Sequence, residues 1–232
     1  MPILNNQVNK LWFNPTYNKF KRNGFSKQLF ASDDSEDFLR TGAYLIEEAK
    51  RYGNTHIPWD ENRRYEILIN PRLENALLSI GIEYLLKGVF LAKGYAINLP
   101  KENIKLTHPV LIKGNISKLR DNEVQDLSYI KDHISKIIDF NEFNNNQQIK
   151  EAKAKKELSG EGVKGLTRLT IPFPNSQQLL DYFHFKRNYS LHRPFIIPEF
   201  VGIVRYEHEL LDYIAIKSTG RSIKQLTKLT TD

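Results

Sequence analysis

The spacing of apolar residues predicts a long central helix from about Pro71 to Tyr95. Apolar positions cover most of the circumference of this stretch, and a helix that is apolar nearly all round is typically buried. Proline suits the first turn of a helix, so we place the start at Pro71. Charged residues interrupt the apolar surface, and we therefore expect a helix of a soluble core and no membrane span. They are Arg72, Glu74, Glu83, Lys87 and Lys93.

A second helix is predicted from about Ser32 to Gly53. Hydroxyl and acidic side chains gather at its beginning, where a helix needs caps and negative charge. Apolar residues then recur at helical spacing, and the basic pair Lys50 and Arg51 precedes the glycine that ends the helix. Between this helix and the central one, the apolar run 65–69 fits either a short strand or a turn that leads into the helix.

Further helices are predicted in the second half of the chain. One runs from about Asn122 to Asn141, where apolar residues form a clear stripe. Another begins at Ser176 and ends before Pro194, because proline cannot continue a helix for long. The last one begins near Glu199 and has an apolar side that reaches about Ile214.

Two stretches between these helices are predicted to be largely irregular. Residues 98–117 contain two prolines and a glycine, and residues 144–167 fit a short charged helix followed by a mobile glycine-rich loop. With four or five helices and no convincing sheet, the chain belongs to the all-α class. We expect a helical domain at 32–217, preceded by an arm at 1–31 and followed by a polar basic tail at 218–232.

The charge of the chain narrows the choice of partners. The sequence has a formal net charge of +7, which favours an anionic partner, with nucleic acid first, although a solvated lysine-rich surface gives the same balance. Residues 11–30 interleave aromatic and basic side chains. That mixture can stack bases and hold phosphates, and it also fits an extended arm that packs its aromatic side chains on the domain.

Several kinds of site are excluded by what the chain does not contain. The absence of cysteine excludes a disulfide scaffold and thiolate metal sites, and it fits a reducing cytoplasm. The first residues show no secretory signal pattern. The glycines near residue 160 do not have phosphate-loop spacing. His133 has no partner at metal-ligand spacing, so we interpret it as a helix-face residue. We expect a cytoplasmic protein without metal or cofactor.

The most informative chemical pattern is the pair Arg187 and His192, separated by four residues at the end of a predicted helix. Arginine presents a planar donor fork that suits phosphate, and histidine exchanges a proton near neutral pH. The same spacing recurs at Arg51 and His56, where it falls on a helix end and a turn, and we interpret that pair as accidental. A solvated arginine beside a polar helix-end histidine is the alternative interpretation of Arg187 and His192.

Neighbours of this pair are candidates for a supporting role. Asn188 precedes His192 by four residues, so the two share a helix face, and the amide could orient the ring or bind phosphate. Lys186 and Arg193 add positive charge directly beside the pair.

Glu83 is a further candidate because it lies in the middle of the apolar central helix. An unpaired carboxylate in such surroundings is costly, so it should face a cation or the solvent. Arg187 is one possible partner. Lys87, four residues later on the same helix, is the other.

Taken together, the order of these motifs resembles the HEPN superfamily. Its members are small helical bundles with an arginine, a few residues and a histidine on the last core helix, and with a long apolar second helix of the Glu-x-Leu-Leu-Lys kind. This chain has Glu83-Tyr84-Leu85-Leu86-Lys87 at the second of those positions. The resemblance covers about residues 36–193 and includes a long spacer between helices two and four. The arm at 1–31, residues 98–117 and the glycine-rich loop depart from the family pattern.

The resemblance implies a metal-independent endoribonuclease. The 2′-hydroxyl of RNA is an internal nucleophile, and His192 would act on it, or on the leaving 5′-oxygen, as general base or acid. Arg187 would hold the scissile phosphate and stabilise the charge that develops on it, with Asn188 beside it.

The resemblance also implies partners. Arg187 and His192 diverge on an ideal helix, and family members pair two such motifs across a two-fold axis, so we expect RNA as substrate and a homodimer with a composite site. A role in a toxin–antitoxin pair, in abortive infection or in other antiphage defence follows from the resemblance alone, with an antitoxin as partner. The alternative is a non-catalytic module that binds RNA or assists a nucleotidyltransferase.

Overall fold

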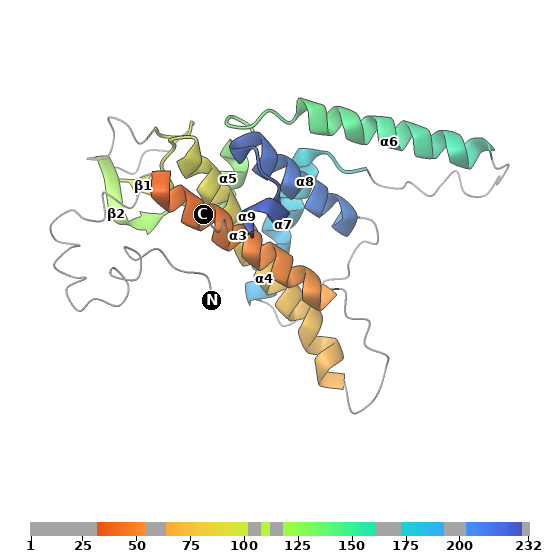
Figure 1. Ribbon diagram of the computed structural model, residues 1–232, viewed down its shortest axis with the longest axis horizontal. Coiled ribbons are helices and arrows are strands. Elements are labelled where there is room, and N and C mark those ends of the chain that lie inside the picture. Colours follow the sequence, from red (N-terminus) through yellow and green to blue (C-terminus); the bar gives the residue numbers. More distant parts are fainter. Residues whose placement is uncertain are drawn as a thin grey trace.

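Two long helices lie side by side at the centre of the protein, α3 (Ser32–Gly53) and α4 (Arg64–Ala92) (Figure 1). The computed structural model describes residues 32–53, 64–101, 108–111, 118–160, 173–192 and 203–228. The other elements within these residues are β1 (Asn98–Pro100), β2 (Leu119–Val124), α5 (Leu127–Ile134), α6 (Asn141–Gly160), α7 (Ser176–His192), α8 (Ile203–Thr219) and α9 (Ile223–Leu226). The mainly helical character confirms the all-α class, and the predicted HEPN-like bundle remains a prediction.

The close approach of α3 and α4 depends on glycines between them. A Cβ atom on Gly42 would lie 2.4 Å from the backbone nitrogen of Leu85, and one on Gly88 would lie 2.8 Å from that of Leu39. Both distances are shorter than real Cβ contacts, and backbone cannot move aside as a flexible side chain can. The absence of a side chain at these positions therefore sets the distance between the two central helices.

The observed boundaries of α3 and α4 can be compared with those predicted from the sequence. α3 spans Ser32–Gly53, as predicted. α4 begins at Arg64, so the run 65–69 is helical and Pro71 lies inside the helix, beyond its first turn. The predicted start is too late because a short apolar run has no period that separates strand from helix, and because proline is common in the first turn of a helix but here lies further inside one.

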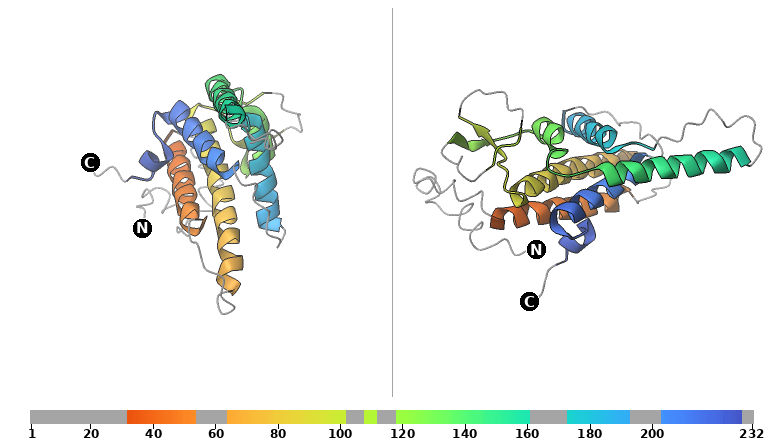
Figure 2. Two further views of the ribbon diagram at one scale, coloured as in Figure 1. Left: turned by 90° about the vertical axis from the view of Figure 1, so that its right-hand side faces the viewer. Right: turned by 90° about the horizontal axis from the view of Figure 1, so that it is seen from above.

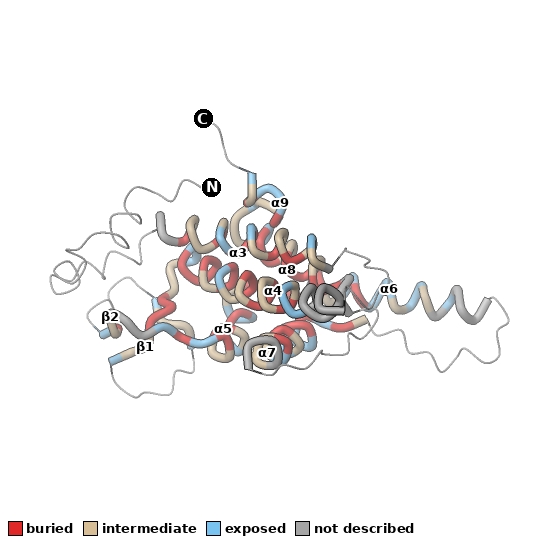
Figure 3. Tube along the Cα trace, turned by 90° about the horizontal axis from the view of Figure 1, so that it is seen from below, coloured by how far each residue is buried: buried red, intermediate tan, exposed pale blue. Residues whose placement is uncertain are grey.

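The core forms where α3, α7 and α8 surround α4, as the views in Figures 2 and 3 show. α4 supplies the largest share of the fully buried apolar side chains. The segment Arg72–Ala92 is long and apolar enough to cross a membrane by length and composition, and most of it is buried against the neighbouring helices. The buried residues of α4 include Leu78, Ile82, Leu85, Leu86, Val89 and Phe90.

The predicted helix 122–141 is wrong at both ends. Residues 119–124 form strand β2, which pairs antiparallel with β1 so that Asn98 lies opposite Val124. The following helix α5 begins at Leu127, because the side chain of Asp126 caps it by accepting a hydrogen bond from the backbone N–H of Tyr129. It ends at Ile134. The two-stranded sheet also corrects the expectation of an irregular stretch without strands, since β1 falls inside residues 98–117.

Helix α6 is much longer than the short charged helix expected there. Its first turns are anchored by the buried side chains of Phe143 and Gln147 and by the ion pair of Lys150 with Glu209 of α8. Beyond that point α6 extends past the other helices (Figures 1 and 2). The glycine-rich loop predicted after it lies outside the described residues, as does the arm at 1–31.

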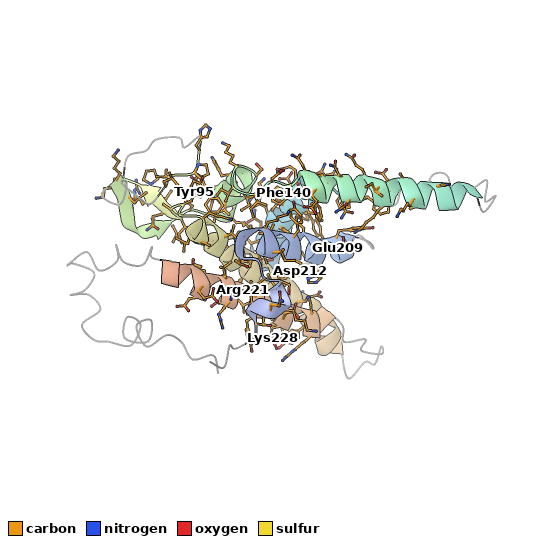
Figure 4. All side chains as sticks on the ribbon, turned by 45° about the horizontal axis from the view of Figure 1, so that its top comes forward. Tyr95, Phe140, Glu209, Asp212, Arg221 and Lys228 are labelled. Atoms are coloured by element: carbon orange, nitrogen blue, oxygen red, sulfur yellow. The ribbon has the colours of Figure 1, made fainter. Side chains whose placement is uncertain are left out.

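Part of the predicted C-terminal tail is packed on the domain. Arg221 makes a two-pronged ion pair with Glu36 of α3, and the pKa of Glu36 is lowered by hydrogen bonding from Arg221. The short helix α9 buries Ile223 and Leu226. Asp212 of α8 accepts a hydrogen bond from the backbone N–H of Ile223, and Figure 4 labels Asp212 and Arg221 at this junction. The sequence up to residue 228 therefore continues the folded domain.

Candidate functional site

The C-terminal half of α7 lies beside α4, and the two helices run in opposite directions (Figure 2). Two consecutive cations on α7, Lys186 and Arg187, approach carboxylates on different helices. Lys186 approaches Glu207 of α8, and Arg187 approaches Glu83 of α4. Successive residues of a helix point about 100° apart, so one α7 turn is held between both neighbouring helices.

Glu83 contacts both cations that the sequence offered as alternatives. Its Oε2 lies 3.4 Å from Nη2 of Arg187, and its Oε1 accepts a hydrogen bond of 2.6 Å from Nζ of Lys87. The side chain of Glu83 is 18% exposed and that of Arg187 is 26% exposed. Because Lys87 and Arg187 both contact the carboxylate, it is held in place and is suited to orient Arg187.

The polar contacts of Arg187 continue along α7 to His184, which was not among the predicted site residues. Nη1 of Arg187 donates to Oδ1 of Asn188 at 3.3 Å, and Nδ2 of Asn188 lies 3.2 Å from Nε2 of His184. The signal was present in the sequence, since His184 precedes Asn188 by four residues and therefore shares its helix face. We name the five residues Lys87, Glu83, Arg187, Asn188 and His184 the Arg187 cluster.

Lys186 does not join the Arg187 cluster, and its predicted supporting role remains a prediction. Its side chain is 1% exposed and that of Glu207 is 0% exposed, with Nζ 3.5 Å from Oε2. Nζ also lies over the ring of Tyr182, 5.7 Å from its centroid. A buried lysine on the α8 side of the helix cannot reach a phosphate at Arg187, so its role is to hold α7 against α8.

His208, next to Glu207 on α8, belongs to the same buried region. Burial lowers the pKa of this histidine from 6.5 to about 4, and the nearby charge of Lys50 acts in the same direction. Its Nδ1 atom is buried without a hydrogen-bond partner among the described residues. The ring is therefore neutral near pH 7, and the residue is partly buried.

Two predicted site residues lie at the limit of what the structure describes. The backbone of His192 is the last residue of α7, as predicted, while its side chain is outside the described part. Arg193 is outside it as well. Because the backbone stays helical to residue 192, His184, Asn188 and His192 occupy positions four residues apart along one face of α7.

Within the described residues no three or more histidine, aspartate and glutamate side chains gather in a way that would hold a metal ion. His133 is buried in α5, where its Nδ1 lies 2.8 Å from the carbonyl oxygen of Tyr129 and its ring stacks on the Tyr129 ring. This histidine is therefore engaged within its own helix.

The Arg187 cluster has the chemistry to bind an anion. Nη1 of Arg187 donates one N–H to Asn188, and Nη2 forms an ion pair with Glu83, so the guanidinium, with five N–H groups, keeps further donors. The Nε of Arg187 is buried and has no hydrogen-bond partner among the described residues. A partly exposed guanidinium with donors left over is suited to a phosphate oxygen.

Comparisons with known proteins returned no match. No family model matches the chain, and neither the curated proteins nor the solved structures contain one that does.

Proposed function

We propose that the chain is a metal-independent endoribonuclease whose site is built around Arg187 and His192. The observation that carries the proposal is the contact of Arg187 with Glu83, at 3.4 Å, in a partly exposed cluster. Two sequence motifs that lie about a hundred residues apart meet there. If the two motifs were unrelated, the arginine of one would not be expected to contact the carboxylate of the other.

In the proposed reaction the 2′-oxygen of RNA forms a bond to phosphorus and the P–O5′ bond breaks. One proton leaves the 2′-hydroxyl for a base, and another reaches the 5′-oxygen from an acid, which leaves a 2′,3′-cyclic phosphate and a 5′-hydroxyl end. His192 acts as one of these proton-transfer groups. The remaining donors of Arg187 stabilise the charge on the phosphate oxygens in the transition state.

We further propose that a second copy of the chain completes the site, since one histidine is not both base and acid in a single step. The substrate is RNA, in keeping with the net charge of +7, and the setting is the cytoplasm, with an antitoxin as a partner that controls the activity. The mass of the purified protein in solution tests the dimer.

A non-catalytic RNA-binding module is the second candidate, and one observation favours it. Both terminal nitrogens of Arg187 already have partners within the chain, namely Glu83 and Asn188. An arginine held in this way can serve to join α4 and α7 without acting on a phosphate.

Cleavage of total RNA in the presence of EDTA tests the proposal, with wild type compared with Arg187→Ala and His192→Ala. We expect cleavage by wild type that leaves 2′,3′-cyclic phosphate ends, and loss of about 100-fold or more in either variant. The matched control is the other pair at the same spacing, Arg51→Ala with His56→Ala, which should leave cleavage unchanged.

Two results would overturn the proposal. Cleavage that survives His192→Ala removes the site assignment. A folded wild type that binds RNA and does not cleave it, with binding reduced by Arg187→Ala, establishes the binding module instead.

A further inference from the structure

The orientation of the Asn188 amide is fixed by its two neighbours. Nη1 of Arg187 lies 3.3 Å from Oδ1 of Asn188, and Nδ2 of Asn188 lies 3.2 Å from Nε2 of His184. An amide can turn by 180° and exchange its two ends. Arginine has only donors, so the oxygen must face Arg187 and the NH₂ group must face the ring.

The same reasoning fixes the proton on the ring of His184. An NH₂ group can only donate, so Nε2 must be the acceptor, and the proton of a neutral ring must be on Nδ1. In water a neutral histidine prefers the other tautomer, with the proton on Nε2. Arg187 thus selects the tautomer of His184 through Asn188.

The contacts connect five side chains in series across two helices. His184 accepts from Asn188, Asn188 accepts from Arg187, Arg187 pairs with Glu83, and Glu83 pairs with Lys87. His184 is half-buried at one end of this series. Removing its lone pair takes away the hydrogen bond that holds the NH₂ end of Asn188, so the amide then holds the guanidinium less rigidly.

We propose that His184 is a positioning residue of the Arg187 site, which accepts a hydrogen bond from Asn188 and thereby holds the guanidinium toward its substrate. The effect on RNA cleavage rests on the proposed function. The effect on the guanidinium does not, so the two can be tested separately.

The first test is nuclear magnetic resonance of the full-length protein, which needs no enzyme activity. We expect the ring nitrogens of His184 to show the Nδ1–H tautomer, and Asn188→Leu to return the ring to the Nε2–H form. We also expect slow rotation of the Arg187 guanidinium about its Nε–Cζ bond. That rotation should become faster in His184→Leu and slow again in His184→Gln, because glutamine can accept from Asn188 four residues later.

The second test measures kcat and KM for RNA with the same variants. Loss of a positioning contact should lower kcat by about 10-fold and leave KM within a factor of about three. His184→Gln should restore most of kcat. The double variant His184→Leu with Asn188→Leu should be no slower than either single variant, since both break one series of contacts. Gln177→Leu, an exposed change on the same helix, should have no effect.

The results separate the two proposals. An Nε2–H tautomer in wild type, or unchanged guanidinium rotation in His184→Leu, overturns the positioning role whether or not RNA is cleaved. Additive losses in the double variant overturn it as well. The expected tautomer and rotation in a protein that cleaves no RNA support the positioning role and refute the ribonuclease.

Discussion

Lys186 and Arg187 are adjacent in the chain and form the same kind of ion pair, yet their surroundings differ. The pair of Lys186 with Glu207 has exposed fractions of 1% and 0%, whereas the pair of Arg187 with Glu83 has 26% and 18%. The first is enclosed between α7 and α8, and the second is partly exposed beside α4. A step of one residue on a helix therefore separates an enclosed charge from one that solvent can reach.

The two ion pairs also differ in the side chains that surround them. Arg187 is linked through Asn188 to His184, so a polar series reaches the surface. Lys186 lies over the ring of Tyr182, and its charge also acts on His208, whose pKa is lowered mainly by burial. Enclosed charges of this kind resist change, because any alteration leaves a partner without compensation in a medium of low polarity.

The largest effect should come from breaking the enclosed pair on one side. Glu207→Leu removes a buried carboxylate that faces the buried ammonium of Lys186, and we expect a loss of about 3–5 kcal/mol in the free energy of unfolding. Urea denaturation measures it. The double variant Lys186→Met with Glu207→Leu should recover most of that loss, because both charges of this pair are then removed. If the double variant were as unstable as the single one, the loss of stability would come from packing and not from charge.

The open pair should respond in function far more than in stability. Arg187→Ala should reduce RNA cleavage by about 100-fold or more, while the free energy of unfolding falls by only about 1 kcal/mol. Activity assays and urea denaturation on the same preparation measure both. A loss of stability as large as that of Glu207→Leu would remove the contrast between the two pairs.

His208 gives the enclosed region a dependence on pH. Its pKa is about 4 in the folded protein and 6.5 is its ordinary value, so between these values the unfolded chain binds a proton that the folded one does not. Its contribution, at most about 3 kcal/mol, is complete above pH 6.5 and is lost as the pH falls toward 4. Unfolding between pH 7 and pH 4 measures this, and His208→Gln should remove that part of the slope. An unchanged slope in the variant would contradict the assignment.

The smallest effect concerns Glu83 and salt. Glu83→Gln keeps the shape of the side chain and removes its charge, and we expect a loss of about 0.2–1 kcal/mol because the pair is partly exposed. Salt screens partly exposed pairs more than enclosed ones, so 1 M NaCl should shrink this loss and leave that of Glu207→Leu unchanged. Melting in low and high salt distinguishes the two. Equal salt sensitivity of both losses would contradict the difference in exposure.

Several features of the Arg187 cluster were predictable because they are local. The spacing of four residues from Glu83 to Lys87, and from His184 to Asn188, places each pair on one helix face whatever the rest of the chain does. The end of α7 follows in the same way from Pro194. The spacing from arginine to histidine does not include His184, although Asn188 lies four residues from both His184 and His192.

Other features followed from contacts between distant segments. Strand β2 forms because it pairs with β1 about twenty residues away, and its own sequence, from Leu119 to Val124, has little strand character. α9 buries Ile223 and Leu226 against the domain, and Arg221 just before it pairs with Glu36, which lies 185 residues earlier in the chain. Neither pairing has a periodic signal in the chain.

The sequence by itself determined the helical class, the extent of α3, the end of α7 and the faces that residues of one helix share, because these depend on neighbours within a few turns. Only the tertiary structure decided that Lys186 is enclosed, that Arg187 is open, and that Glu83 serves two cations at once. Consecutive residues on a helix have the same local environment in sequence. Each side chain leaves the helix in a different direction, and its surroundings depend on which neighbouring helix packs on that side. The packing of neighbouring helices is a property of the whole fold.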